Sequence, residues 1–246
     1  MNAKRILACA ALLLGLLSFN APLSAAVESD VVGYVAVQME EGKWYEVGCP
    51  FVDLNDKEEL PLNEVFVSGF SQGDTLCMLD PETSTYSDYL YWIDEKQAWC
   101  DRPIAAIAKP STATLTPGQA VYIHKDTVGQ VFLSGKVEAK AAVFGSENGP
   151  TWVLVTPIWP ETRDVNAYAW EGLTQGDTLT VLDSESGSYA DNVYWDEAKG
   201  AWCDRPISAI AKPITLELTP GQAVFLNKKT TGVATVTPKN ASSANN

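Results

Sequence analysis

The sequence predicts an all-β protein of two tandem, pseudo-symmetric domains, sandwich or barrel-like, built from hairpins with at most short helices. The first observation is a fixed offset of 103 residues. Residues 72–125 align without a gap to residues 175–228, and 34 of the 54 positions are identical. The second is that short β-prone runs alternate with turn residues. The third is that no long segment has the 3.6-residue period of a helix. A repeat near 100 residues indicates two copies of a whole domain.

Residues 1–26 have the features of a secretory signal peptide. Lys4 and Arg5 form a basic start, residues 6–17 form an apolar run, and Ser24 and Ala26 precede the predicted cleavage site. The apolar run is too short to cross a bilayer, and no other segment approaches that length. We therefore expect an exported chain without a membrane span, in the periplasm, at the cell surface or outside the cell.

Each copy has the pattern of a β-meander. In the first copy GDTLCML, YSDYLYW and AWC are separated by the turns DPETST and IDEKQ; in the second, GDTLTVL, YADNVYW and AWC are separated by SESGS and DEAKG. TPGQAVYI and TPGQAVFL then add a strand after a Pro-Gly turn. Upstream, WYEVGCPF resembles TWVLVTPI when Tyr45 is set against Trp152. The predicted domains are residues 27–135 and 136–236.

Three further segments complete the chain. Residues 103–109, PIAAIAK, favour a short helix opened by Pro103, with irregular chain as the alternative. The stretch AWCDRPI occurs at 98–104 and at 201–207, and we interpret it as structural, with Asp101 and Arg102 tethering the segment after the hairpin. Residues 237–246 are polar and of low complexity, which predicts a disordered tail.

Four cysteines follow the predicted cleavage site. An exported chain folds in an oxidising compartment, where an even number of cysteines favours disulfides. Cys49 and Cys77 align with threonines in the second copy, whereas Cys100 and Cys203 occupy the same position in each copy. Partners of one disulfide should appear or disappear together, so we predict Cys49–Cys77 and Cys100–Cys203. The pairing Cys49–Cys100 with Cys77–Cys203, and a set of buried free thiols, are the alternatives.

No complete catalytic constellation is evident in the sequence. The single histidine, His124, aligns with Asn227, and no serine lies in a G-x-S-x-G context. Glycoside hydrolysis needs two unlike acids facing one bond, whereas the duplication places equal acids in separate domains. A carboxylate-dependent hydrolase is therefore the third-ranked function, and we predict that the protein is not an enzyme and needs no cofactor.

Acidic residues flank the first hairpin turn of each copy. They are weak candidates for calcium ligands, although their spacing is not that of an EF-hand loop. Asp is also a common turn former, which is the alternative interpretation. No C-x2-C spacing indicates zinc. The six calcium candidates are Asp80, Glu82, Asp88, Asp183, Glu185 and Asp191.

Aromatic residues give the strongest indication of a binding surface, since the chain contains eight tryptophans and nine tyrosines. Tyr and Trp on a β-sheet can form a platform for the apolar face of a sugar ring. The recurring tryptophans are the candidate ligand-binding residues: Trp92, Trp99, Trp195 and Trp202. The alternative is that these rings fill the cores, because large aromatics supply much of the buried area of a small β-domain.

The chain resembles an uncharacterised β-rich module of secreted Gram-negative bacterial proteins. The motifs that carry the resemblance are VVGYVAVQMEEGKW, the GDTL…YW…AW meander and LTPGQAVYI. Both copies fit the later half of the module and only the first fits its G-Y-V…G-K opening. Cys49 and Thr156 replace the usual Asn before the Pro turn. The resemblance implies a secreted β module and assigns no site residues.

The net charge of −14, which becomes −16 without Lys4 and Arg5, argues against nucleic acid and anionic lipid as partners. These observations favour a non-catalytic extracellular or cell-surface interaction module that binds polysaccharide or another surface protein. The alternative is a structural, self-assembling subunit of the cell envelope. The sequence does not specify the oligomeric state.

Overall fold

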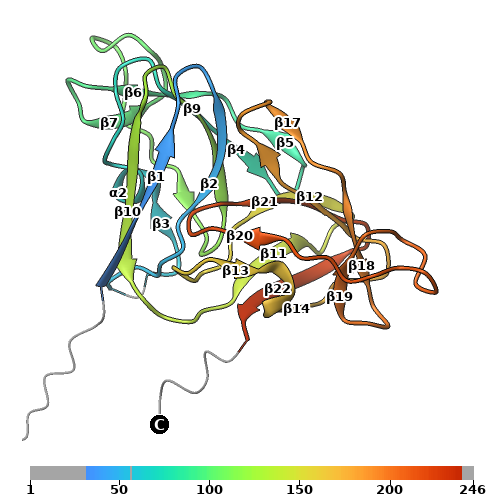
Figure 1. Cartoon of the computed structure of the whole chain (residues 1–246). Coiled ribbons are helices and arrows are strands. Elements are labelled where there is room, and N and C mark those ends of the chain that lie inside the picture. Colours follow the sequence, from blue (N-terminus) through green and yellow to red (C-terminus); the bar gives the residue numbers. More distant parts are fainter. Residues whose placement is uncertain (1–31, 56, 240–246) are drawn as a thin grey trace, which may run out of the picture.

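Antiparallel β-sheets make up nearly all of the structure, a computed structural model that describes residues 32–55 and 57–239 (Figure 1). This confirms the all-β prediction. The predicted signal peptide lies outside the described residues. Within the described ranges no helix is long and apolar enough to cross a membrane. Strands β1–β10, here called the first half, pair among themselves, as do strands β11–β22, the second half.

In the first half the principal sheet has the strand order β2-β9-β4-β6-β7, with β5 paired to β4. A separate pair, β1-β10, and a short pair, β3-β8, complete it. The bounds are β1 (Val32–Met39), β2 (Trp44–Gly48), β3 (Leu60–Pro61), α2 (Leu62–Val65), β4 (Thr75–Asp80), β5 (Thr85–Tyr86), β6 (Leu90–Ile93), β7 (Ala98–Cys100), β8 (Thr114–Leu115), β9 (Ala120–His124) and β10 (Gly129–Lys136).

The principal sheet of the second half has the corresponding order, β12-β21-β15-β18-β19, and β14 adds a third strand to the β11-β22 pair. The short pairs are β13-β20 and β16-β17. The bounds are β11 (Ala142–Ser146), β12 (Thr151–Val155), β13 (Arg163–Asp164), η1 (Val165–Ala167), β14 (Tyr168–Glu171), β15 (Thr178–Thr180), β16 (Leu182–Asp183), β17 (Ser188–Tyr189), β18 (Val193–Asp196), β19 (Ala201–Cys203), β20 (Glu217–Leu218), β21 (Val224–Lys228) and β22 (Gly232–Pro238).

The register of β2 and β12 corrects the predicted alignment upstream of the long repeat. Trp44 lies opposite His124, and Trp152 lies opposite Asn227, which is the counterpart of His124 at the offset of 103. Trp152 therefore occupies the place of Trp44, not that of Tyr45. A one-residue slip moves every side chain of a strand to the other face, so the correction decides which side chains share a surface.

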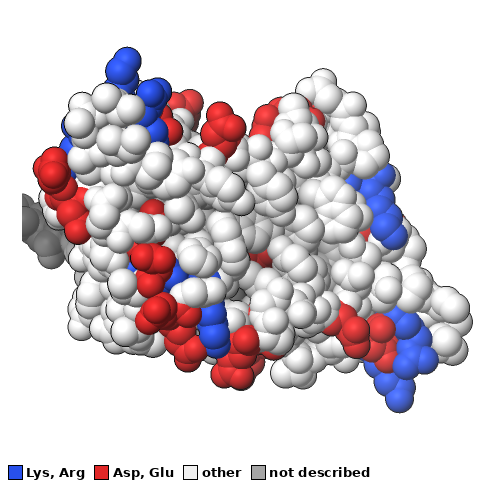
Figure 2. Space-filling view, turned by 90° about the horizontal axis from the view of Figure 1, so that it is seen from above, with Lys and Arg blue, Asp and Glu red and all other residues white. Residues whose placement is uncertain are grey.

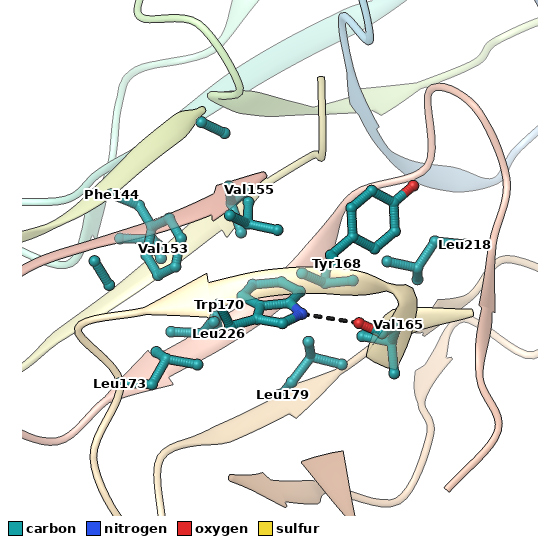
Figure 3. Close-up of a cluster of buried hydrophobic side chains, with 14 of the residues drawn as sticks. Phe144, Val153, Val155, Val165, Tyr168, Trp170, Leu173, Leu179, Leu218 and Leu226 are labelled. Atoms are coloured by element: carbon teal, nitrogen blue, oxygen red, sulfur yellow. Dashed lines mark hydrogen bonds between the residues drawn. The ribbon is translucent and has the colours of Figure 1, made fainter. Parts of the chain in front are cut away.

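Each half is built around its own apolar core. The first contains Trp92 and Trp99 and the second contains Trp195 and Trp202. Figure 3 shows the second core, in which the indole Nε1 of Trp170 donates a hydrogen bond of 2.8 Å to the Val165 carbonyl. Burial of several large aromatic rings on one side of each sheet supplies much of the hydrophobic stabilisation.

The other faces of the two principal sheets pack against each other. This interface, which we call the junction, contains Cys77, Leu79, Ala120 and Tyr122 from the first half and Leu154, Ala223 and Phe225 from the second. The bridges Val47–Gln222 and Gln119–Val155 cross it. Strands β9 and β21 are covered on both faces. The runs AVYI (120–123) and AVFL (223–226), which form or lead into these strands, are therefore apolar throughout.

Two short helical turns hold the repeated tryptophan strands in place. Asn63 of α2 accepts a hydrogen bond of 2.7 Å from the Trp99 backbone N–H, and Asn166 of η1 accepts one of 2.8 Å from that of Trp202. Asp101 accepts from the Lys109 N–H at 2.8 Å, which is the predicted tether of the repeated AWCDRPI stretch. Residues 103–109 form a turn and no helix, so the short helix predicted there is wrong and irregular chain is the correct alternative.

The end of the chain is partly ordered. Strand β22 continues to Pro238, which pairs with Tyr168. The prediction of disorder from residue 237 was therefore wrong for Thr237 and Pro238, because their backbone is paired in a sheet. Residues 240–246 of the predicted tail lie outside the described residues.

The predicted disulfides are wrong, because Cys49, Cys77, Cys100 and Cys203 are buried free thiols. Cys49 packs in the first core, whereas Cys77 lies on the opposite face of the sheet, at the junction. Cys100 and Cys203 lie on β7 and β19, the strands at the far ends of the two principal sheets. Their burial is that of small hydrophobic residues.

Candidate functional site

The repeated tryptophans do not form a surface platform. Trp92, Trp99 and Trp202 are at most 1% exposed and Trp195 is 6% exposed. Trp92 donates to Asp94 at 3.0 Å and Trp99 to the Phe66 carbonyl at 2.9 Å. Their ring faces are covered by core neighbours, so these four residues fill the cores, which was the alternative interpretation.

Two of the six acidic hairpin residues, Asp80 and Asp183, act as turn formers, whereas Glu82 accepts hydrogen bonds from Ser146 and Asn148 of the second half. Asp80 accepts from the Glu82 N–H at 2.8 Å, and Asp183 accepts from the Glu185 N–H at 2.9 Å, which are Asx-turn contacts. Hydrogen bonds hold the pKa of both aspartates below its ordinary value, chiefly from the Glu82 N–H at Asp80, and from the Ser186 hydroxyl and then the Glu185 N–H at Asp183. Asp88 and Asp191 are exposed. Nowhere in the described part of the chain do three His, Cys, Asp or Glu side chains gather as a metal site would require.

An aromatic cleft lies where the two halves meet. Its cavity of about 270 Å³ is lined by Trp44, Cys77, Tyr86, Tyr89 and Tyr122 of the first half and by Leu182, Gly187 and Tyr189 of the second. Tyr86, Tyr89 and Tyr189 are 54%, 49% and 43% exposed, so their rings are accessible to a ligand. The cleft therefore combines apolar ring faces with phenolic hydroxyls.

Corresponding positions of the two copies supply most of these rings. Tyr86 and Tyr189 are related by the offset of 103, as are Tyr122 and Phe225. All point to the face of their sheet that lies opposite the core, because residues alternate between faces along a strand. Trp152 extends the row of rings by stacking on Phe225 at 4.8 Å, and Phe225 lies 5.3 Å from Tyr189.

Ring contacts fix the geometry of the first-half wall. Tyr86 and Tyr122 meet edge to face with centroids 5.2 Å apart. Trp44 lies 6.0 Å from Tyr89 and 5.1 Å from His124. His124, the single histidine, thus supports an aromatic wall. In the view from above, charged side chains lie mainly around the margin of the surface and its middle is largely uncharged (Figure 2).

A chain of hydroxyls leads from the cleft to a buried carboxylate. Tyr86 donates to Tyr122 at 3.3 Å, Tyr122 and Tyr189 share a hydrogen bond of 2.5 Å, and Tyr189 donates to Glu46 Oε1 at 2.7 Å. Each phenol carries one proton, so the shared proton runs from Tyr122 to Tyr189 and the chain is polarised toward Glu46.

Burial controls the protonation of the Glu46 carboxyl group. Glu46 is 7% exposed, and desolvation raises its pKa from 4.5 to about 7 against the opposing effect of the Tyr189 hydrogen bond. Desolvation also raises the pKa values of Tyr122 and Tyr189, and it raises that of the Cys77 thiol to about 11. The phenols and the thiol are therefore protonated at neutral pH and act as hydrogen-bonding groups, not as nucleophiles.

The sequence pattern does not reveal the cleft, because the tryptophans that recur identically are the stronger aromatic signal and lie in the cores. A weaker sequence feature indicates the cleft: Tyr86 recurs as Tyr189, and Tyr122 is matched by the aromatic Phe225. Glu46 had no signal, since it corresponds to Leu154 in the second half. Comparison with known proteins adds no assignment, because no protein-family model, no curated protein and no solved structure matches the chain.

Proposed function

We propose that the protein is an exported, non-catalytic interaction module that binds polysaccharide in the aromatic cleft. The observation that carries the proposal is the set of accessible tyrosine rings around one cavity, with Tyr86 and Tyr89 on one side and Tyr189 on the other. A pyranose ring has an apolar C–H face and equatorial hydroxyls. It therefore matches a surface that offers both ring faces and phenolic hydroxyls.

The size of the cavity and the charge of the chain fit a polysaccharide ligand. A cavity of about 270 Å³ lies just below the roughly 300–1,000 Å³ usual for small-molecule sites, which suits one sugar unit of a longer chain. The net charge of −14 disfavours acidic polymers and leaves neutral polysaccharides as the preferred ligands. Export through residues 1–26 would place the protein where such polymers occur.

Affinity electrophoresis in gels that contain soluble neutral polysaccharides tests the proposal. The chain from Val27 should migrate more slowly with at least one polymer, and Tyr89→Ala should restore most of its mobility. Tyr34→Ala is the matched control, because Tyr34 is 78% exposed on β1 and lies outside the cleft. Unchanged mobility in every polysaccharide, or equal retardation of Tyr89→Ala and the native chain, would overturn the proposal.

A structural role is the second candidate, and β1 is the observation that favours it. Among the described residues β1 pairs with β10 alone, which leaves its outer edge open for another strand. Val32 and Tyr34 on this strand and Phe132 on β10 are exposed. Self-assembly through this edge would appear in light scattering as a particle size that grows with protein concentration, and a constant monomer size would exclude it.

A further inference from the structure

Four oxygen atoms form a continuous chain from the aromatic cleft into the junction. They are the hydroxyl oxygens of Tyr86, Tyr122 and Tyr189 and Oε1 of Glu46, joined in that order by hydrogen bonds of 3.3, 2.5 and 2.7 Å. The cleft end is accessible, since Tyr86 is 54% exposed and lines the cavity. The other end is closed, because Glu46 is 7% exposed and its second oxygen, Oε2, is buried.

The number of protons in this chain decides what the cleft offers to a ligand. When Glu46 is ionised, the three phenols supply three protons for three hydrogen bonds, so every O–H is committed within the chain. When Glu46 is protonated, four protons are present for the same three hydrogen bonds. One O–H must then point out of the chain, either at the carboxyl end or at the cleft end.

The carboxyl end is the unfavourable place for the surplus proton. Oε2 has no hydrogen-bond partner, and the Leu182 hydrogen bond that lowers the pKa of this carboxyl is donated by a backbone N–H, which accepts no proton. A proton on Oε2 would therefore be an unsatisfied buried donor. A proton on Oε1 donates to Tyr189 instead, which turns the Tyr189 hydroxyl toward Tyr122. The Tyr86–Tyr122 pair is then left with one O–H that no other member of the chain accepts.

We propose that protonation of Glu46 gives the aromatic cleft an additional hydrogen-bond donor at the Tyr86–Tyr122 pair and thereby regulates the binding of polysaccharide. This inference rests on the proposed function of the cleft and adds its regulation. Ring oxygens and glycosidic oxygens of a sugar chain accept hydrogen bonds and have no proton to donate, so they match the additional donor. The affinity for a neutral polysaccharide should rise as Glu46 becomes protonated.

The surroundings of Glu46 place its protonation near neutral pH. Desolvation raises its pKa to about 7, and the hydrogen bonds that act on it come from neutral phenols and a backbone N–H. The charges of Lys43, Asp183 and Glu185 act on one another and not on the pKa of Glu46. Residues 219–223, which also border this part of β2, contain no titratable side chain. The other titratable side chains on this face of the sheet are Tyr86, Tyr122, His124 and Cys77.

Infrared difference spectra of the chain from Val27 between pH 6 and pH 8 test the proton switch without a ligand. We expect the C=O band of a protonated carboxylic acid to appear on acidification with a midpoint near pH 7. The tyrosine C–O band should shift with the same midpoint, because its frequency depends on whether the phenol donates or accepts a hydrogen bond. Isotope-labelled tyrosine identifies the second band.

Two variants separate the carboxyl from the phenols. Glu46→Gln should remove the pH dependence of both bands, since residue 46 no longer exchanges a proton. Tyr189→Phe keeps a ring in the cleft but interrupts the chain, so the carboxyl should still titrate, at a higher pH because a hydrogen bond that lowers its pKa is lost. The tyrosine band should no longer follow it. Tyr34→Phe is the matched control, because Tyr34 is exposed on β1 and lies outside the cleft.

A tyrosine band that stays unchanged between pH 6 and pH 8 in the native chain would overturn the inference. An equal change of this band in Tyr189→Phe would overturn it too, because the signal would then not pass along the chain of hydroxyls.

Affinity electrophoresis at pH 6 and pH 8 measures the consequence for binding. The dissociation constant for a retarding polysaccharide should be about fivefold lower at pH 6, the value of one hydrogen bond of about 1 kcal/mol. It should be the same at both pH values in Glu46→Gln and in Tyr189→Phe. Equal dissociation constants in the native chain would refute the regulation. Absence of retardation at either pH would overturn the proposed function instead, and the infrared spectra then decide on the proton switch alone.

Discussion

The carboxylate of Glu46 in β2 accepts a hydrogen bond of 2.7 Å from the hydroxyl of Tyr189 in β17, 143 residues further along the chain. This contact is one of several polar links between the halves, together with the Ser146 hydroxyl that donates to Glu82 and the Thr156 N–H that donates to the Gly118 carbonyl. A buried polar link is satisfied only when its two partners meet, so it selects one packing of the halves over others.

Protonation of Glu46 should couple stability to pH. Its pKa is about 7 in the folded chain and 4.5 when unfolded, so the folded state binds more protons between these values. The free energy of unfolding should therefore fall as pH rises from about 4.5 to 7, by up to about 1.4 kcal/mol per pH unit. Urea unfolding of the native chain and of Glu46→Gln at pH 5, 6, 7 and 8 measures this. If the free energy of unfolding depended on pH in the same way in both proteins, the raised pKa of Glu46 would be contradicted.

Gly48 and Thr156 occupy corresponding strand ends and touch across the junction. A Cβ on Gly48 would lie 2.4 Å from Thr156 Cγ2. Gly48→Ala should therefore lower the free energy of unfolding by about 1–3 kcal/mol, as overpacking does. Thr156→Ser removes the clashing methyl and keeps the hydroxyl that donates to Gln222 at 2.7 Å. A double-mutant cycle in urea should show that Thr156→Ser rescues Gly48→Ala only in part, because the Cβ of residue 156 would still lie 2.6 Å from the new Cβ. Simple additivity of the two changes would speak against this contact.

The second hairpin turn of each copy carries a left-handed residue, Gln97 with φ 49° and Gly200 with φ 59°. For residues other than glycine this conformation is destabilising by roughly 1–2 kcal/mol. Gln97→Gly should raise the free energy of unfolding by about 0.5 kcal/mol, whereas Gly200→Ala, with nothing within 4 Å of the new Cβ, should lower it by about 1 kcal/mol. Thermal unfolding measures both, and shifts of the same sign would refute the explanation.

Burial should protect the four thiols. It raises the pKa values of Cys49 and Cys77 to about 11, so neither ionises near neutral pH. We expect the native chain from Val27 to react slowly with a thiol-specific chromogenic reagent and to release four thiols in guanidinium chloride. Reducing agent should leave the melting temperature unchanged. A non-reduced peptide map that contains a disulfide-linked pair of cysteines would contradict the assignment of four free thiols.

The sequence predicted the fold class and the strands better than it predicted the sites. Turn residues and repeated runs locate β4, β6 and β7, because local hydrogen bonding and strand alternation are encoded in neighbouring residues. The disulfide argument failed because co-occurrence of Cys49 and Cys77 says nothing about which face of a sheet each occupies. The tryptophan hypothesis failed for the same reason, since Trp92 and Trp99 face the core.

The aromatic cleft depends on how the halves pack, which local pattern does not encode. Tyr122 and Tyr189 lie 67 residues apart and meet only because the outer faces of the principal sheets pack together. Glu46 appears in the sequence as an ordinary charged residue in an edge strand. Its burial, and hence its raised pKa, arises from the second half covering β2.

Tryptophan fluorescence during titration with a retarding polysaccharide tests the central claim most directly, because Trp44 lies in the wall of the cleft. The core tryptophans should not respond to a ligand. We predict an emission shift in the native chain that is mostly lost in Trp44→Phe, with Trp152 at the end of the row of rings as the remaining reporter. The gel retardation of this variant should persist, because phenylalanine retains a ring face. An emission shift of the same size in Trp44→Phe would place the ligand elsewhere and contradict the account.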